Sequence, residues 1–133
     1  MSRLAVVVQR YGADISGGAE LHARYIAERL SSSFDVRVLT TCARDYVTWR
    51  NEFTPGTETI NGIVVERFSV ARERNLQEFG VRSRRVFYRS HTLQEELEWL
   101  ESQGPVSPGL LWALIAQHSN PRPLLCKRSA LTN

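Results

Sequence analysis

Apolar and polar positions over the first 40 residues form three blocks that predict a strand, a helix and a second strand. Residues 4–8 are apolar without interruption, which is typical of a strand buried on both faces of a parallel sheet. From residue 18 to residue 30, apolar side chains recur at helical spacing. On another face of that helix, charged residues spaced for an i,i+4 ladder are Glu20, Arg24 and Glu28. Residues 34–40 then alternate, so a right-handed βαβ unit is expected.

A long polar connection and a hairpin follow this unit. Residues 41–56 include Trp49, whose ring we interpret as packing on the domain rather than contacting a ligand. The β-prone runs 57–60 and 63–68 flank Asn61-Gly62, and this dipeptide is the strongest short-range signal of a β-hairpin.

The second half of the chain is predicted to be helical. The first of these helices is amphipathic, with apolar positions at Leu76, Phe79, Val86 and Phe87. Thr92 and Glu95 form a capping box that opens the next helix. Its expected buried stripe is Leu93, Leu97 and Leu100. Gly104-Pro105 ends that helix, and Ser107-Pro108 starts another that ends near His118. The residues of this last helix expected to point inward are Leu110, Leu111, Leu114 and Ile115.

Composition narrows the class of protein. The 133 residues, 42% of them hydrophobic, suffice for one domain with a core. No stretch approaches the length of a membrane span, and Gln9-Arg10 interrupts the apolar run that a signal peptide would need. Cys42 and Cys126 lie far apart, so we interpret them as free thiols in a reducing cytoplasm and expect no metal site.

Basic residues cluster in one segment. Seven of the arginines lie there: Arg67, Arg72, Arg74, Arg82, Arg84, Arg85 and Arg89. An acidic run, residues 95–101, follows and favours a solvated, partly neutralised face. The alternatives are an anionic acceptor, nucleic acid, or peripheral contact with anionic lipid at the inner face of a membrane. Aromatic residues for base stacking are sparse, so no specific nucleic acid is expected.

Gly17 and Gly18 open the first helix directly after the first strand and its loop. Bare backbone N–H groups at a helix start can seat a phosphate or diphosphate. The alternative is plain turn chemistry, with Gly17 as a weak N-cap and Glu20 at the third helical position. A P-loop is excluded because Gly18-Ala19 stand where Lys and Ser/Thr are required, and a dinucleotide GxGxxG spacing is absent.

Four blocks of sequence in this order resemble the N-terminal domain of GT-B glycosyltransferases of family 4. They are the strand 4–8, Gly17-Gly18-Ala19-Glu20-Leu21-His22, the strand 36–40, and Ile60-Asn61-Gly62-Ile63-Val64-Val65-Glu66-Arg67-Phe68. The likeness covers about residues 3–118 and implies an α/β fold, the Rossmann-like N-terminal half of a two-domain enzyme. Such enzymes transfer a sugar from a nucleotide-sugar donor to a glycan or lipid-linked acceptor, with retention of configuration and without a bound metal or cofactor.

The resemblance also assigns roles by position. It implies that Gly17 and Gly18 lie near the donor diphosphate or sugar, and Gln9, Arg10 and Tyr11 on the same loop are candidates for the acceptor side. It identifies no catalytic residue. The three histidines do not fall where the family has its mid-domain histidine, and we assign no role to His22, His91 or His118.

Residues 119–133 depart from the family pattern, because two prolines interrupt the place of the next strand. We therefore expect a partial acceptor-side domain over residues 1–118, a divergent or disordered tail over residues 119–133, and an incomplete sheet. A truncated chain of this kind is expected to be inactive alone. The alternatives are an acceptor-binding module that works with a separate donor-domain chain, and a basic nucleic-acid-binding domain that uses Arg72–Arg89.

Overall fold

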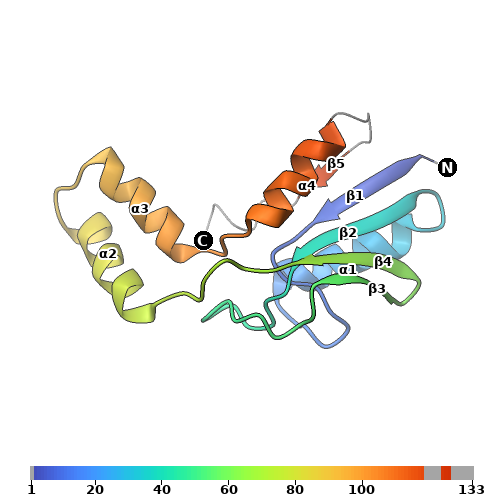
Figure 1. Cartoon of the computed structure of the whole chain (residues 1–133), viewed down its shortest axis with the longest axis horizontal. Coiled ribbons are helices and arrows are strands. Elements are labelled where there is room, and N and C mark those ends of the chain that lie inside the picture. Colours follow the sequence, from blue (N-terminus) through green and yellow to red (C-terminus); the bar gives the residue numbers. More distant parts are fainter. Residues whose placement is uncertain (1, 119–123, 127–133) are drawn as a thin grey trace.

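The computed structural model describes residues 2–118 and 124–126, and these form an α/β fold around one open mixed sheet (Figure 1). The strand order is β3-β4-β2-β1-β5. The strands are β1 (Arg3–Val7), β2 (Asp35–Thr41), β3 (Gly56–Ile60), β4 (Ile63–Phe68) and β5 (Leu124–Cys126). The helices are α1 (Gly18–Leu30), α2 (Leu76–Tyr88), α3 (Leu93–Gln103) and α4 (Pro108–His118). Every neighbouring pair is parallel except β3–β4, and the order of the four parallel strands is compatible with a Rossmann-like arrangement.

One face of the sheet carries the main core, against α1. Val6, Val38 and Val65 point to this face from three adjacent strands and are buried, because alternate residues of a strand share a face. Ala23 and Ala27 of α1 meet them and are fully buried. Small side chains on the helix let it approach the branched side chains of the sheet closely. The predicted order of strand, helix and strand is confirmed, and β1 and β2 pair in parallel.

The opposite face of the sheet is covered by α4, and its buried cluster is smaller than the main core. Ala5, Val7 and Leu39 form its buried cluster, and Leu110 and Leu114 of α4 pack against them. The prediction that Leu111 and Ile115 also point inward is wrong, since each is more than half exposed. One helix can turn only a narrow stripe toward a sheet, and no other described element covers the far side of α4.

The hairpin of β3 and β4 is confirmed at the predicted turn. Asn61 and Gly62 both have positive φ angles, 49° and 78°, which the tight two-residue turn between twisted strands requires. Ile60 pairs with Ile63 across the turn. β3 is therefore an antiparallel edge strand on an otherwise parallel sheet.

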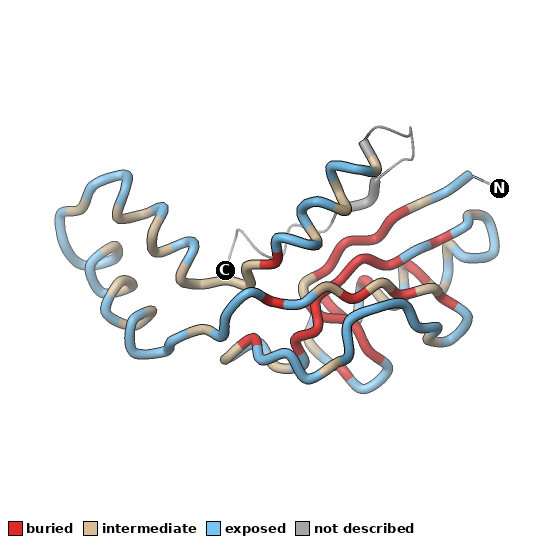
Figure 2. Tube along the Cα trace, in the orientation of Figure 1, coloured by how far each residue is buried: buried red, intermediate tan, exposed pale blue. Residues whose placement is uncertain are grey.

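Helices α2 and α3 form a helical hairpin that stands away from the sheet (Figure 1). Trp99 holds the two helices together, stacking on Phe79 with ring centroids 6.3 Å apart and meeting Phe87 edge-on at 5.4 Å. The capping box of Thr92 and Glu95 is present. The expected buried stripe on α3 is wrong, because all of its members are exposed: Leu93, Leu97 and Leu100. Figure 2 shows that the hairpin has no buried residue.

A narrow stem joins the hairpin to the sheet domain. The N–H of Ala71 donates to the carbonyl of Val106 at 2.8 Å, so the chain leaves and returns at one point. Trp49 Nε1 and Arg74 Nε both donate to the carbonyl of Gln103, each at 2.7 Å. Trp49 is 4% exposed, which confirms the interpretation that its ring packs rather than faces a ligand.

β5 lies in the segment that the sequence analysis treats as a divergent tail. It pairs in parallel with β1, from Ala5–Leu124 to Val7–Cys126, and forms an edge of the sheet. The remainder of that segment, residues 119–123 and 127–133, lies outside the described residues. None of the described helices combines the length and apolar character needed to cross a bilayer.

Candidate functional site

The amino-terminal end of α1 lies at the carboxyl edge of the sheet, where parallel α/β sheets bind their ligands (Figure 1). Gly17 is the N-cap, with φ −66° and ψ 151°, and no side chain caps the helix there. The helical bonds begin with the Leu21 N–H, which donates to the Gly17 carbonyl at 2.8 Å. Within the described residues, the N–H groups of Gly18 and Ala19 have no protein acceptor. They are the groups of a helix start that can bind an anion.

The two glycines have different surroundings. A Cβ on Gly17 would lie 2.0 Å from Oε2 of Glu20 and 2.8 Å from Nη2 of Arg10, so a side chain there has to displace the ends of both of these side chains. A Cβ on Gly18 would meet nothing within 4 Å. Turn chemistry and packing therefore account for Gly17, whereas Gly18 leaves the helix end open to an approaching ligand.

Arg10 and Glu20 form a buried ion pair beneath the helix start. Arg10 Nε and Nη2 lie 3.1 Å and 3.0 Å from Oε1 of Glu20, and each residue is 8% exposed. Arg10 Nη1 also donates to the carbonyl of Arg44 at 2.8 Å. The charge of Arg10 is thus balanced within the protein, and its guanidinium is held rigidly at the edge of the site.

This pairing overturns the predicted charge ladder along α1. Glu20 turns to Arg10 instead of Arg24, because the N-terminal turn brings it over the loop after β1. Arg24 donates to the carbonyls of Gly12 and Ala13, the former at 3.0 Å. Arg24 therefore fastens the same loop from its other side.

Tyr11, predicted on the acceptor side, is fully buried in the core beneath α1. Burial, reinforced by the charge of Glu28, raises the pKa of its phenol to about 12. An acceptor-facing role for this side chain is wrong, because the loop turns it inward onto the sheet. Gln9 is partly exposed, and its backbone carbonyl accepts a hydrogen bond of 2.6 Å from Thr41 Oγ1. Gln9 therefore stays a candidate for the acceptor side.

A hollow of about 280 Å³ opens beside the helix start. Its lining residues are Arg10, Asp14, Ile15, Ser16, Gly17, Arg44 and Tyr46. An ion pair between Arg44 and Asp14 forms one wall, and the exposed ring of Tyr46, 5.3 Å from the Arg10 guanidinium, forms another. Charged pairs beside an aromatic ring suit a ligand that carries polar groups, such as hydroxyls or phosphates, next to an apolar surface.

Arg44 and Tyr46 were missed as site residues by the sequence reasoning. Both belong to the long connection after β2, and the length of that connection was the available signal. The loop returns to the site because the Cys42 N–H donates to the Phe68 carbonyl at 3.0 Å, while the Glu52 N–H donates to the Cys42 carbonyl at 2.9 Å.

Arg67 was counted with the exposed basic run, and that interpretation is wrong. It is 3% exposed and lies below the site. Its Nη2 donates to the Tyr11 carbonyl at 2.6 Å, its Nε donates to Glu58 at 2.8 Å, and its guanidinium lies 3.8 Å from the centre of the Phe53 ring. It ties the loop after β1 to the carboxyl end of β4.

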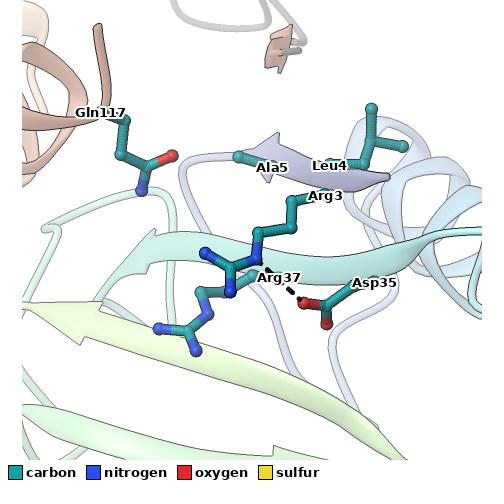
Figure 3. Close-up of a pocket in the computed structure, with 6 residues that line it drawn as sticks. All are labelled: Arg3, Leu4, Ala5, Asp35, Arg37 and Gln117. Atoms are coloured by element: carbon teal, nitrogen blue, oxygen red, sulfur yellow. Dashed lines mark ion pairs between the residues drawn. The ribbon is translucent and has the colours of Figure 1, made fainter. Parts of the chain in front are cut away.

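A second hollow, of about 250 Å³, lies at the opposite edge of the sheet (Figure 3). Arg3, Asp35 and Arg37 line it together with Gln117 of α4, and Arg3 pairs with Asp35 at 3.7 Å. It adjoins the amino ends of β1 and β2, away from the edge where helix starts and loops converge. We therefore take the hollow beside Gly17 as the candidate site.

Among residues 2–118 and 124–126, no three or more side chains of His, Cys, Asp and Glu are grouped so that they could hold a metal ion. Cys42 is buried, which raises the pKa of its thiol. His22 lies on α1, and His91 contacts Glu96 near the start of α3.

Comparisons with protein-family models, curated proteins and solved structures found no match to this chain.

Proposed function

We propose that this chain is the acceptor-side, Rossmann-like domain of a GT-B glycosyltransferase of the family 4 type. The complete enzyme would move a sugar, with retention, from a nucleotide-sugar to a glycan or lipid-linked acceptor. The observation that carries the proposal is the open start of α1 at Gly18, beside a polar hollow at the carboxyl edge of a parallel sheet.

The physical argument concerns the charge of a nucleotide-sugar. Its diphosphate is anionic, and negative charge grows on it as the sugar departs. The free N–H groups of Gly18 and Ala19 and the partial positive charge of the helix end would stabilise that charge without moving. The Arg10–Glu20 pair fixes the helix start while adding almost no net charge of its own. Arg44 and Tyr46 border the space that an acceptor would occupy, and Gln9 lies on the same loop as Arg10.

We test binding and not sugar transfer, because enzymes of this family carry their main donor contacts on a second, facing domain. Ligand-observed NMR with UDP-glucose, GDP-mannose and inorganic pyrophosphate would detect weak occupancy of this edge. We expect at least one of these probes to bind.

Gly18→Asp is the informative variant. The new side chain has open space, and a carboxylate in the first helical turn stabilises a helix, so the fold should persist. The same carboxylate would repel a diphosphate and weaken its binding about tenfold. Gly80→Asp, at an equally open helical glycine on α2, is the matched control and should leave binding unchanged.

Absence of binding for all three probes would refute the proposal. Equal weakening by Gly18→Asp and Gly80→Asp would also refute it, because the effect would then not belong to the start of α1.

A further inference from the structure

We propose that the outer end of the α2–α3 hairpin is a contact surface for an anionic lipid bilayer. This hairpin tip consists of Arg84, Phe87, Tyr88, Arg89 and Leu93. It is the part of the hairpin farthest from the sheet, at the turn between the two helices (Figure 1). The inference stands apart from the proposed glycosyltransferase function and from the hollow beside Gly17.

Apolar side chains at the hairpin tip face solvent. Tyr88 is 83% exposed, Leu93 is 72% exposed and Phe87 is 64% exposed, and they lie within seven residues of one another in the chain. Figure 2 shows the whole turn as exposed or only partly covered. An exposed group of large apolar side chains at a protruding end is unfavourable in water and marks a binding surface.

The hairpin tip is positively charged, and its two arginines have no carboxylate partner among the described residues. The described acidic side chains facing this region are already engaged: Glu78 and Glu98 with Arg82, Glu95 with Arg85, and Glu96 with His91. Among the described residues, no carboxylate pairs with Arg84 or Arg89. These two guanidiniums are therefore available to an outside anion.

A small hollow brings these basic groups together. It measures about 220 Å³ and is lined by Val81, Arg84, Arg85 and Arg89. A phosphate headgroup fits such a space, with the guanidiniums donating to its oxygens. Phe87, Tyr88 and Leu93 would then enter the boundary between headgroups and acyl chains, where aromatic and aliphatic side chains are stabilised.

The shape and composition of the hairpin tip favour a bilayer over nucleic acid or a protein. Tyr88 and Phe87 could each stack on a base, but the acidic flank of α3 would repel a phosphate backbone that extends along it. A stable protein interface needs roughly 800 Å² on each partner, more than one helical turn presents. An exposed apolar turn with arginines beside it on α2 can penetrate a headgroup layer.

Vesicle flotation with the full chain tests the inference. The vesicles are phosphatidylcholine alone, or phosphatidylcholine with about a third of phosphatidylglycerol to supply negative charge. We expect the chain to float with the anionic vesicles and not with the neutral ones. Arg84→Gln combined with Arg89→Gln should lower the partition coefficient about 25-fold, fivefold for each arginine. Tyr88→Ser combined with Leu93→Ser should lower it at least about tenfold.

Matched controls come from α1, where Tyr25 and Arg29 are also exposed. Tyr25→Ser combined with Arg29→Gln removes the same kinds of group and should leave flotation unchanged. Circular dichroism confirms that each variant keeps its helices. Failure to float with anionic vesicles at low salt, or equal losses in tip and control variants, overturns the inference. Tight binding to a generic RNA or DNA that the two tip arginines abolish, without vesicle binding, would assign the surface to nucleic acid instead.

Discussion

Replacing each of the adjacent glycines at the start of α1 by alanine should change stability in opposite directions. The two substitutions add the same methyl group to neighbouring positions on the chain. At Gly17 that methyl would overlap Oε2 of Glu20 at 2.0 Å and crowd Nη2 of Arg10 at 2.8 Å. At Gly18 it meets nothing within 4 Å.

The expected magnitudes follow from these surroundings. Gly17→Ala has to displace the carboxylate of Glu20, and we expect this shift to separate it from Arg10. Breaking a buried ion pair costs about 3–5 kcal/mol, so the free energy of unfolding should fall by roughly 3 kcal/mol if Arg10 keeps its bond to the Arg44 carbonyl. Gly18→Ala reduces the freedom of the unfolded chain and favours the helix, so it should add about 0.5 kcal/mol.

Urea unfolding followed by circular dichroism and tryptophan fluorescence measures both changes, provided the two signals give the same transition. A double-mutant cycle with Glu20→Ala isolates the cause. Once Glu20 is truncated, adding the methyl at Gly17 should lower the free energy of unfolding little further, so the coupling energy between the two sites should be about 3 kcal/mol.

Two outcomes would refute the reasoning. One is a loss of less than about 1 kcal/mol for Gly17→Ala, which would mean that the Arg10–Glu20 pair shifts without penalty. The other is strict additivity in the cycle, which would mean that the methyl acts on something other than Glu20.

Two further predictions concern Arg67 and His91. Arg67→Met should lower the free energy of unfolding by about 3 kcal/mol, because the Tyr11 carbonyl and the Glu58 carboxylate lose their donor. Urea unfolding measures this change, and a value below about 1 kcal/mol would contradict the proposal that Arg67 holds the loop after β1 to β4. The pKa of His91 should lie above its ordinary value, raised first by the carbonyl of Arg89 and then by Glu96. Its contribution to stability is therefore complete below the unfolded-state pKa and fades as the pH rises through the folded-state pKa, and an NMR titration of the ring showing no upward shift would contradict this.

Features that depend on neighbouring residues in the chain were predicted well. The bounds of α1, the turn at Asn61-Gly62 and the capping box of Thr92 all follow from contacts within four residues. Backbone geometry and local hydrogen bonds decide such features, and sequence spacing records them directly.

Features that depend on what covers an element were predicted less well. Leu93 and Leu111 have the spacing of buried helical residues, yet no described element lies over them. A periodic pattern shows that a face is apolar, but it does not show which partner the fold brings to that face.

Long-range polar pairs escaped the sequence for a similar reason. Arg10 and Glu20 lie ten residues apart, and Arg67 reaches Tyr11 across 56 residues. Such pairs form because the carboxyl ends of β1, β2 and β4 converge at one edge of the sheet. The glycines of the candidate site could be named from the sequence, and their role stays a prediction, whereas Arg44 and Tyr46 come to the hollow only through the folded loop.

The stem of the α2–α3 hairpin has a consequence for how this domain can be altered. A bond between Ala71 and Val106 closes the excursion. Further ties are the Gln103 carbonyl shared by Trp49 and Arg74, and the bond from the Arg74 N–H to the Thr48 carbonyl. Segments whose ends meet at one surface point are the ones that tolerate replacement or insertion. We therefore expect residues 72–105 to be exchangeable: a different helical pair could be grafted at the same two positions while the strands and α1 keep their register, provided that the new segment again covers Trp49.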